Sequence, residues 1–418
     1  MKLCIVGLGY VGLPLAVAFA KHYPIIGFDI KKERVEELKQ GRDRTGEVTA
    51  EELKQAQIAF SIDPTCIKEA DFVIITVPTP TTPDKKPDLR PIQSASHTVG
   101  QHLKKGAVVM LESTVYPGVT EDLMAPILEE ESGLKCGKDF FIGYSPERVN
   151  PGDKEHTIAK LVKIVSGMDS ETLKKVAEVY GKITTIHQAP TIKTAEAAKV
   201  IENIQRDLNI ALMNELSLVF NRMDIRLKDV LAAAGTKWNW HAYTPGLVGG
   251  HCIPEDPYYL AEKALQLGYN PAVILAGRFI NEYMPVHVAN LVEEGLLEAG
   301  KKVRGAKIGI LGLTFKKNVP DYRNTKVKDL VRELQDRGMK PLLHDPLLTQ
   351  EEVEKTFGLP NTPLEAFKEM DGIVYAVDHE AFKAVTLEKI KKMQKGKAVI
   401  VDLVWRFAHE KELVYKSF

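Results

Sequence analysis

A cysteine in a glycine-rich loop is the residue of this sequence best suited to covalent chemistry. Cys252 follows Gly249, Gly250 and His251, and Asp256 comes four residues later. Most cysteines behave as inert small hydrophobes, but this flexible polar setting favours a reactive thiol, which attacks as the thiolate. His251 has two readings, one in which it tunes the thiol and one in which it is structural. The loop therefore predicts a nucleophilic cysteine.

A second set of polar residues recurs at helical spacing. In the stretch EAAKVIENIQRDLN, intervals of three and four residues separate Glu196, Lys199, Asn203 and Arg206, which places them on one helix face. A lysine and an asparagine one turn apart can stabilise a developing alkoxide and hold a water between them. The same spacing is typical of a solvated polar stripe, and the residue types leave both readings open.

The beginning of the chain carries a dinucleotide-binding fingerprint. Gly7, Gly9 and Gly12 form G-x-G-x-x-G directly after an apolar run and at the start of a helical pattern. The glycines permit a tight turn, close approach of a pyrophosphate, and close helix–strand packing. Asp29 closes the next apolar run, where a carboxylate accepts the ribose hydroxyls and repels a 2′-phosphate, so NAD is expected rather than NADP. Arg34 would reach the adenosine or remain a solvated helix charge.

Hydroxyl residues follow two more apolar runs. Thr79 comes after FVIITV, and Ser113 and Thr114 come after VVMLE. Ligands of open α/β sheets bind at the carboxyl ends of strands, so these loops are expected to line the cofactor site. A single hydroxyl is more often a turn or cap residue. A nucleotide-dependent oxidoreductase with a nucleophilic cysteine suggests oxidation through a thioester.

The elements that position these residues alternate between strands and helices. Strands are predicted at 2–6, 25–29, 72–77, 108–112, 140–144 and 162–166, and helices at 11–21, 31–40, 92–103 and 120–130. A long helix without glycine or proline is predicted from 194 to 221. A second alternation has strands at 307–312, 340–344, 372–377 and 398–403. The prediction is an α/β protein with two Rossmann-like, doubly wound domains joined by a long central helix and a helical middle domain.

Composition narrows the function classes. The 418 residues contain 56 Lys plus Arg and 56 Asp plus Glu, so the net charge is zero, which argues against a nucleic-acid binder or a protein held at a membrane by charge. No apolar run reaches about 18 residues, so no membrane span is expected. The four cysteines are too dispersed for a disulfide framework or a zinc site, so no metal is expected. A cytoplasmic protein is expected.

The sequence resembles the nucleotide-sugar 6-dehydrogenases, the family of UDP-glucose, UDP-N-acetylmannosamine and UDP-N-acetylglucosamine/galactosamine dehydrogenases. The resemblance covers nearly the whole chain and is carried, in the family's order, by GLGYVGLP, ESTVYPGVT, GYSPERVNPGD, EAAKVIEN, PGLVGGHCIPEDPYYL and GLTFKKNVPDYRNTK. AGTKWN, followed by PGLVGGHC and DPYYL, is most similar to the UDP-N-acetylglucosamine/galactosamine branch. Glu255 and the segment 240–244 depart from that branch, which leaves the exact sugar open.

The resemblance implies a four-electron oxidation at one site, with two NAD⁺ used in sequence. The implied catalytic residues are Cys252, Lys199, Asn203, Thr114, Glu147 and Asp256. The lysine and asparagine, with a water near the threonine, assist the first hydride transfer from C6. The cysteine then adds to the aldehyde, a second hydride transfer leaves a thioester, and the two carboxylates aid its hydrolysis to the uronate.

The resemblance also implies the residues that bind the two nucleotides. Those around NAD are Gly7, Gly9, Tyr10, Val11, Gly12, Asp29, Arg34, Thr79, Thr114 and Arg323. Those around the UDP-sugar are Arg148, Val149, Lys199, Asn203, Arg206, His241, Gly249, Phe315 and Lys316. Arginine and lysine suit a pyrophosphate in an otherwise neutral protein.

The implied domains are an NAD-binding domain at 1–193, a central helical dimerisation and catalytic domain at 194–300, and a UDP-sugar-binding domain at 301–418. The implied substrate is a UDP-N-acetylhexosamine, with UDP-N-acetylglucosamine preferred, oxidised for surface polysaccharide or glycan synthesis. UDP-N-acetylmannosamine and UDP-glucose are the alternatives. The long helix implies a homodimer or a higher homo-oligomer.

Two other function classes fit parts of the sequence. A two-electron β-hydroxyacid dehydrogenase shares the glycine fingerprint and the helical Lys–Asn pair, but it leaves Cys252 and the second α/β unit unexplained. A non-catalytic nucleotide-sugar sensor predicts binding without turnover, yet no residue of the implied catalytic set is missing.

Overall fold

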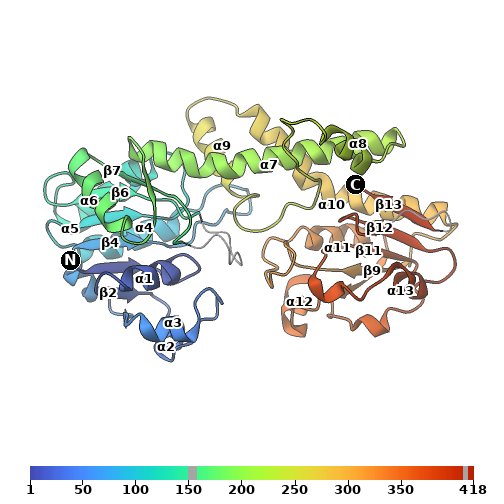
Figure 1. The fold of residues 1–418 in the computed structure, drawn as a ribbon, viewed down its shortest axis with the longest axis horizontal. Coiled ribbons are helices and arrows are strands. Elements are labelled where there is room, and N and C mark those ends of the chain that lie inside the picture. The colour runs from blue at the N-terminus through green and yellow to red at the C-terminus, as the bar shows by residue number, and fades with distance from the viewer. Residues whose placement is uncertain (149–157, 408–412) are drawn as a thin grey trace. The chain divides into compact units, whose positions relative to one another are not determined.

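The computed structural model describes residues 1–148, 158–407 and 413–418. These residues divide into two compact units, the first made of Met1–Asn203 with Tyr258–Asn270 and the second of Ile204–Pro257 with Pro271–Phe418. Each unit is built on its own β-sheet (Figure 1).

The first unit contains an eight-stranded sheet with the order β3-β2-β1-β4-β5-β6-β7-β8. Its strands are β1 (Leu3–Val6), β2 (Ile25–Phe28), β3 (Ala59–Ser61), β4 (Phe72–Ile75), β5 (Val108–Leu111), β6 (Phe141–Tyr144), β7 (Lys163–Gly167) and β8 (Ile186–Gln188). Paired strands run parallel, except that β6 and β7 are antiparallel. The strand order reverses between β1 and β4, which is where ligands bind in open α/β sheets.

Helices cover both faces of this sheet because successive strand residues point to opposite sides. Leu3 and Ile5 of β1 share a core with α1 (Gly12–Ala20), α2 (Lys32–Lys39), α3 (Ala50–Gln55) and α6 (Ser170–Tyr180). Cys4 and Val6 share a second core with the 3₁₀ helix η1 (Pro64–Glu69), α4 (Arg90–Gln101), the π-helical turn η2 (Thr120–Met124) and α5 (Ala125–Ser132). The predicted doubly wound, mostly parallel sheet is confirmed.

The second unit contains a five-stranded parallel sheet with the order β10-β9-β11-β12-β13. Its strands are β9 (Lys307–Leu311), β10 (Lys340–His344), β11 (Gly372–Tyr375), β12 (Val399–Asp402) and β13 (Val414–Ser417). One face packs against α10 (Ala272–Glu298), α11 (Val327–Asp336) and α12 (Gln350–Phe357). The other packs against η3 (Leu364–Ala366), η4 (Glu380–Phe382) and α13 (Leu387–Lys392). The second predicted α/β unit is therefore confirmed as well.

A long helix passes from the first unit into the second. α7 (Ile192–Arg222) has 31 residues and matches the predicted helix 194–221. It is followed by α8 (Leu227–Ala234), by the loop at 235–255 that carries Cys252 (the cysteine loop) and by α9 (Asp256–Gln266).

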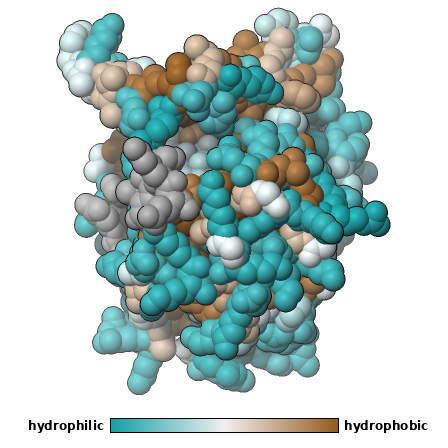
Figure 2. All heavy atoms as spheres, turned by 90° about the vertical axis from the view of Figure 1, so that its right-hand side faces the viewer, coloured by the Kyte–Doolittle hydropathy of each residue, from teal (hydrophilic) through white to brown (hydrophobic). Residues whose placement is uncertain are grey.

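The end of the second unit that faces the viewer in Figure 2 is mainly hydrophilic, with hydrophobic residues gathered toward its upper edge. Within the described residues, no helix combines the length and hydropathy needed to cross a bilayer.

Three strands lie outside the sequence prediction. β3 and β8 are three-residue strands at the two edges of the first sheet, and most of their side chains are exposed or half-buried. Such short edge strands lack the apolar run by which buried strands are recognised. β13 lies at the other end of the chain, at the edge of the second sheet. The predicted helix 120–130 is divided into a π-helical turn, η2, and the α-helix α5.

Candidate active site

The glycine fingerprint forms the turn between β1 and α1. Gly7 has a φ of +96°, and a Cβ on Gly12 would lie 1.9 Å from the carbonyl oxygen of Gly7. Thr76, directly after β4, donates its hydroxyl to that oxygen at 2.7 Å, which fixes the turn. A Cβ on Gly9 would meet no atom within 4 Å. The turn therefore leaves open space at the N-terminus of α1, where backbone N–H groups favour a pyrophosphate.

Asp29 follows β2 and is oriented by two backbone groups. The N–H of Leu8, inside the glycine turn, donates to Oδ2 at 2.9 Å, and the N–H of Lys31 donates to Oδ1 at 2.9 Å. A carboxylate oxygen that accepts one hydrogen bond can accept another, so both oxygens can still receive the ribose hydroxyls. Together with the open glycine turn, this arrangement fits NAD.

Arg34, on α2, is buried rather than solvated. Its Nε donates to the Leu8 carbonyl at 2.8 Å, its Nη2 to Asp43 at 2.7 Å and its Nη1 to Glu37 at 3.1 Å. The reading of Arg34 as a solvated helix charge is therefore wrong. Because the polar edge of its guanidinium is bonded within the protein, a contact with the adenosine would use the flat face of the group. That contact stays a prediction.

The loops after β4 and β5 are held by hydroxyl groups. Tyr259 of α9 donates its hydroxyl to the carbonyl of Thr79 at 2.9 Å. Ser113 donates its own to the carbonyl of Val77 at 2.6 Å, which joins the two loops at the carboxyl end of the sheet. Thr114, the next residue, is half-buried at this edge. Ser113 thus braces the loop that presents Thr114.

Glu196 of α7 fastens the same loop to the helix. Its carboxylate accepts the N–H of Gly118 at 2.6 Å, the N–H of Thr120 at 2.9 Å and the hydroxyl of Thr120 at 2.7 Å. Burial raises the pKa of Glu196 above its ordinary value, although these hydrogen bonds oppose the rise. Glu196 therefore fixes the loop that begins at Thr114 against the helix that carries the Lys–Asn pair.

The polar stripe of α7 is buried, not solvated. Glu196, Lys199 and Asn203 are buried, which contradicts the reading of a solvated face. Arg206 is exposed, and the next buried polar residue of the helix is Asp207. Asp207 Oδ1 accepts Nη1 of the buried Arg278 at 2.6 Å, which accounts for its burial. Arg206 keeps the predicted helical spacing but is exposed, and its contact with substrate stays a prediction.

A buried ionic cluster lies beside Glu147. Lys163, at the start of β7, places its Nζ 2.7 Å from Glu112 Oε2, 3.7 Å from Glu147 Oε2 and 3.1 Å from the carbonyl of Pro146. Tyr180 donates its hydroxyl to Glu112 Oε1 at 2.5 Å. Burial raises the pKa of Glu112 to about 6, and Lys163 limits the rise. Sequence reasoning missed this cluster because its members come from separate strands and helices.

Arg148, the next residue, is tied to α7. Its Nη2 lies 2.7 Å from Glu202 Oε1, and its Nη1 donates to the carbonyl of Val162 at 2.6 Å. A pocket of about 10 Å³, close to the size of one water molecule, is lined in part by Glu147, Arg148 and Lys163. Val149, also predicted to contact the sugar nucleotide, lies outside the described residues.

Cys252 lies exposed in the loop before α9. Its carbonyl accepts the N–H of Asp256, the buried first residue of that helix, at 2.9 Å. Asn324 donates its side-chain amide to Glu255 Oε1 at 2.6 Å and to the carbonyl of Gly250 at 3.3 Å. Glu255, which departs from the resembling branch, therefore ties the cysteine loop to the loop after β9.

Phe315 packs on the two glycines of the cysteine loop. A Cβ on Gly249 would lie 2.9 Å from Phe315 Cβ, and a Cβ on Gly250, whose φ is +92°, would lie 2.9 Å from the Phe315 ring. A larger residue at Gly250 would displace the ring, and one at Gly249 would meet the carbonyl oxygen of Asn324 at 2.8 Å. Gly249 and Phe315, both predicted to bind substrate, therefore lie together, with Lys316 half-buried beside them.

Asp321 contacts both Arg323, a predicted cofactor-binding residue, and His251, the neighbour of Cys252. It accepts Nε of Arg323 at 2.9 Å and Nη2 at 2.7 Å, and its Oδ2 lies 3.4 Å from Nε2 of His251. Burial would raise the pKa of Asp321, but the hydrogen bonds from His251 and Arg323 hold it well below its ordinary value. The ion pair with Asp321 supports the structural reading of His251.

Asp345 in the second unit corresponds in position to Asp29 in the first, but its carboxylate is not accessible. The N–H of Leu313 donates to Oδ2 of Asp345 at 2.6 Å, as that of Leu8 does to Asp29. Asp345 directly follows β10, and it is fully buried against His379, whose Nε2 lies 3.1 Å away. The carboxylate of Asp345 is therefore closed to a ribose.

Each unit holds one part of the predicted site. The first contains Gly7, Gly9, Tyr10, Val11, Gly12, Asp29, Arg34, Thr79, Thr114, Glu147, Arg148, Lys199 and Asn203. The second contains Arg206, His241, Gly249, Cys252, Asp256, Phe315, Lys316 and Arg323. Tyr10, Arg206 and His241 are exposed. Among the described residues, no group of three or more His, Cys, Asp and Glu side chains could hold a metal ion.

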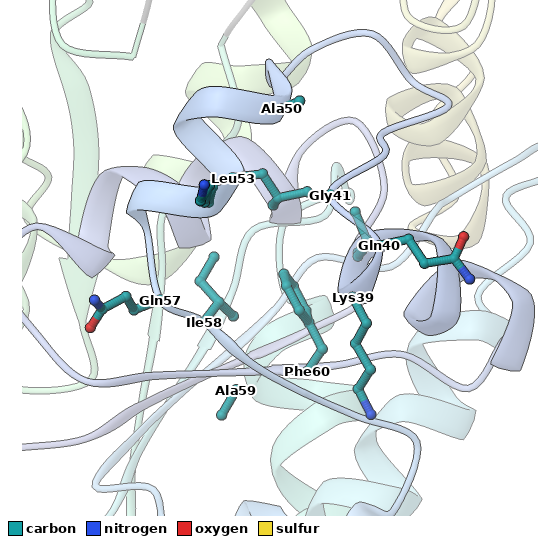
Figure 3. Close-up of a pocket in the computed structure, with 11 residues that line it drawn as sticks. Lys39, Gln40, Gly41, Ala50, Leu53, Gln57, Ile58, Ala59 and Phe60 are labelled. Carbon is teal, nitrogen blue, oxygen red and sulfur yellow. The ribbon is translucent and has the colours of Figure 1, made fainter.

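A pocket of about 700 Å³ lies between α2, α3 and β3 (Figure 3). Leu53, Ile58 and Phe60 point into it, with Lys39 and Gln57 toward its sides. It lies beside the start of β3, whereas the glycine turn follows the end of β1. The pocket is therefore separate from the cofactor turn.

Family models match three consecutive parts of the chain. The NAD binding domain of the UDP-glucose/GDP-mannose dehydrogenase family matches residues 1–184. The central domain of that family matches residues 193–283, and its UDP binding domain matches residues 309–407.

Individual relatives are similar along nearly their full lengths. The chain is 51% identical to Protein CapL of Staphylococcus aureus, covering 91% of this chain and 90% of that protein. It is 48% identical to UDP-N-acetyl-D-glucosamine 6-dehydrogenase of Pseudomonas aeruginosa, covering 98% of each chain. The solved structure of UDP-D-ManNAc dehydrogenase from Pyrococcus horikoshii superposes with a TM-score of 0.91 at 31% identity, covering 100% of this chain and 99% of that one.

Proposed function

The chain belongs to the UDP-glucose/GDP-mannose dehydrogenase family, and we propose that it oxidises the C6 hydroxyl of UDP-N-acetylglucosamine to a carboxylate. The observation that carries this choice of substrate is the 48% identity with a UDP-N-acetyl-D-glucosamine 6-dehydrogenase over 98% of both chains. The identity with a UDP-D-ManNAc dehydrogenase is 31%. The product, a UDP-uronic acid, would serve surface polysaccharide or glycan synthesis.

In this proposal the chain has three functional domains. Residues 1–193 bind NAD, residues 194–300 form the central catalytic and dimerisation domain, and residues 301–418 bind the UDP-sugar. The matched family domains at 1–184, 193–283 and 309–407 support these ranges. The open glycine turn and the oriented Asp29 support the first assignment, and the closed Asp345 supports a different nucleotide for the last.

NAD, when bound, supplies the hydride acceptor for both oxidations. Gly7, Gly9 and Gly12 would leave its pyrophosphate close to backbone N–H groups, and Asp29 would accept its ribose hydroxyls. Tyr10, Val11, Arg34, Thr79, Thr114 and Arg323 would complete the contacts. A carboxylate at Asp29 disfavours a 2′-phosphate, so the chain would use NAD rather than NADP.

The first oxidation removes a proton from the C6 hydroxyl and a hydride from C6. Lys199 and Asn203 would stabilise the developing alkoxide through their N–H groups, with a water held near Thr114 to take the proton. Their burial supports this role because hydrogen bonds act more strongly where water is excluded. The product of this step is an aldehyde.

The second oxidation needs a covalent bond. Sγ of Cys252 adds to the aldehyde carbon, and the resulting thiohemiacetal loses a hydride to leave a thioester. A water then attacks the acyl carbon, its proton passes to Glu147 or Asp256, and the C–S bond breaks to return the electron pair to sulfur. The whole reaction converts one alcohol, one water and two NAD⁺ into one carboxylate, two NADH and three protons.

The remaining predicted residues would hold the sugar nucleotide. Arg148, Val149, Arg206, His241, Gly249, Phe315 and Lys316 are assigned to it. The packing of Phe315 on Gly249 supports a shared surface at this part of the second unit. Lys316 and the two arginines would face the pyrophosphate, whose charge they complement.

We also propose that the chain forms a homodimer, or a higher homo-oligomer, in the cytoplasm. Large hydrophobic side chains are exposed on the two long helices, namely Ile201, Leu212 and Val219 of α7 and Val273 and Phe279 of α10. The spacing of the first three, 11 and 7 residues, keeps them on one side of the helix. Such an apolar surface is typical of a protein interface. The cytoplasm would keep Cys252 reduced.

The experiment is a stoichiometric assay with a substrate panel. Purified protein is incubated with NAD⁺ and UDP-N-acetylglucosamine, UDP-N-acetylgalactosamine, UDP-N-acetylmannosamine or UDP-glucose. We expect two NADH per sugar oxidised and the highest kcat/KM with UDP-N-acetylglucosamine. A single NADH per sugar would contradict the thioester mechanism. A preference for UDP-N-acetylmannosamine or UDP-glucose would contradict the substrate choice alone.

A further inference from the structure

A buried cation between two carboxylates is the feature of the first unit that the proposed reaction does not use. The side chains of Lys163 and Glu112 are 7% and 0% exposed, and that of Glu147 is 14% exposed. Removing charges from water is costly, and buried ion pairs often add little to stability compared with apolar side chains of the same volume. The cluster therefore calls for an explanation other than folding.

The cluster gives Glu147 a fixed position relative to the sheet. Lys163 is the first residue of β7 and Glu112 directly follows β5, so both belong to the sheet that carries the cofactor turn. From there Lys163 Nζ contacts Glu112 Oε2 at 2.7 Å and the Pro146 carbonyl at 3.1 Å, and it approaches Glu147 Oε2 at 3.7 Å. Lys163 therefore holds both the Glu147 side chain and the backbone just before it.

We propose that Lys163 is a positioning residue, which holds the Glu147 carboxylate in place to accept a proton from the water that hydrolyses the thioester. This inference rests on the proposed function. Of the two proton acceptors named above, this inference takes Glu147: the water oxygen bonds to the acyl carbon, its proton moves to Glu147, and the C–S electron pair leaves with Cys252. Lys163 forms no bond to the substrate and undergoes no net change.

Apart from Lys163, the charged groups around Glu147 are carboxylates and an arginine that is already paired. Glu112 faces it from the position directly after β5 and Glu47 interacts with it from the loop before α3, and both are carboxylates. Arg148, its neighbour, has its guanidinium engaged by Glu202. Tyr180, on α6, donates to Glu112 rather than to Glu147. Lys163 is therefore the side-chain cation that both anchors Glu147 and offsets the carboxylates beside it.

The effect of the two carboxylates on the pKa of Lys163 agrees with this arrangement. Burial by itself would lower the pKa of Lys163, yet Glu112 and Glu147 raise it above the ordinary value, so the amine stays charged. Burial raises the pKa of Glu112 to about 6, and the contact with Lys163 limits this rise.

The test follows decay of the acyl-enzyme in a single turnover. Wild-type protein and Lys163→Met are mixed with NAD⁺ and the preferred UDP-sugar, quenched over time, and analysed by mass spectrometry for the acyl group on Cys252. With Lys163→Met we expect the acyl-enzyme to accumulate. In a plot of its hydrolysis rate against pH, we expect the acidic limb to move up by about 1–3 pH units. Below that limb, hydrolysis at a given pH falls about tenfold for each unit. Formation of the acyl-enzyme should change much less.

Two further variants separate positioning from folding. Lys163→Arg keeps the charge and should keep the wild-type limb to within about half a pH unit, although its geometry differs. If Lys163→Met does not fold, Lys163→Met with Glu112→Gln removes the cation and a carboxylate together. We expect the acidic limb of this double variant to lie at a higher pH than that of wild type. The difference should be smaller than the one expected for Lys163→Met alone.

The outcomes are distinct. A variant without Lys163 whose hydrolysis limb superimposes on that of wild type would overturn the positioning role, even if less of the protein were folded. A wild-type protein that releases fewer than two NADH per sugar, or never carries an acyl group, would instead contradict the proposed function. Normal wild-type turnover with a displaced limb in the variants supports both.

Discussion

The buried side chain of Asn214 and the backbone of Gly246 exchange two hydrogen bonds. Nδ2 of Asn214 donates to the Gly246 carbonyl at 3.1 Å, and the Gly246 N–H donates to Oδ1 of Asn214 at 2.8 Å. Asn214 also donates to Oδ1 of Asn281, on α10, at 2.8 Å. Gly246 lies in the segment between α8 and α9 that carries Cys252, so α7 sets the position of that part of the loop.

Asn214→Ala removes both bonds and leaves the Gly246 groups without their partner. Unpaired buried polar groups cost about 1–3 kcal/mol, so we expect the free energy of unfolding to fall by that amount and kcat to fall as well. Chemical denaturation and steady-state kinetics measure the two effects. The matched control is Asn209→Ala, on the same helix, whose amide donates to the Gln205 carbonyl one turn away. Equal losses in the two variants would show that Asn214 does not fix the loop.

Cys252→Ser should stop the reaction after the first oxidation. A serine hydroxyl is a much weaker nucleophile than a thiolate at neutral pH, so we expect at most one NADH per active site and no uronate. NAD binding, measured by calorimetry, should stay unchanged. Cys136→Ser is the control, because burial raises the pKa of Cys136 to about 11 and keeps it an inert thiol. Uronate formation by Cys252→Ser at the native rate would refute the thioester.

Asp29→Asn should weaken the choice between NAD and NADP. Hydrogen bonds to a charged group contribute about 1.5–3 kcal/mol each, so loss of the charge should raise KM for NAD about 10- to 100-fold. The variant should also use NADP better than wild type does, because the repulsion of the 2′-phosphate is removed. The ratio of kcat/KM values for the two cofactors tests this. Glu33→Gln, exposed in the first turn of α2, should leave the ratio unchanged.

His287 should make the protein less stable as the pH falls. Burial, with a smaller effect of Arg222, lowers the pKa of His287 from 6.5 to about 4. The folded protein therefore binds this proton less tightly than the unfolded chain does. Its contribution to stability is complete above pH 6.5 and is lost as the pH falls toward 4, by about 3 kcal/mol.

The measurement is the free energy of unfolding at several pH values between 4 and 7. His287→Gln should lack this part of the pH dependence, so the stability of wild type relative to the variant should decline over that interval. His22→Gln, at an exposed position after α1, is the control and should follow wild type. Parallel curves for wild type and His287→Gln would show that His287 does not titrate in this way.

The cofactor half of the site could be predicted from sequence because its determinants are local. The glycine turn, Asp29 and the strands around them lie within one β-α-β segment, and each has a recognisable pattern. The cysteine loop could also be recognised from its local pattern of glycines beside Cys252, although the contact of Gly250 with the Phe315 ring could not. Short-range patterns of this kind identify both the elements and the residue types.

The supporting residues could not be predicted in the same way. Glu112 and Lys163 lie 51 positions apart and come together only because β5 and β7 belong to one sheet. The periodicity of α7 also does not show which polar residues are buried: the contact with Arg278 on α10 buries Asp207, whereas its neighbour Arg206 is exposed. Both outcomes depend on pairings between distant elements, which helical or strand spacing does not specify.

The closed carboxylate of Asp345 makes the two nucleotide positions non-interchangeable. Both sheets present a leucine N–H to an aspartate, yet only Asp29 keeps its oxygens available, since Asp345 is occupied by His379. An adenosine ribose therefore gains no carboxylate partner at Asp345. High concentrations of NAD should saturate the enzyme without displacing the sugar nucleotide, so the cofactor does not act as a competitor of the substrate that it oxidises.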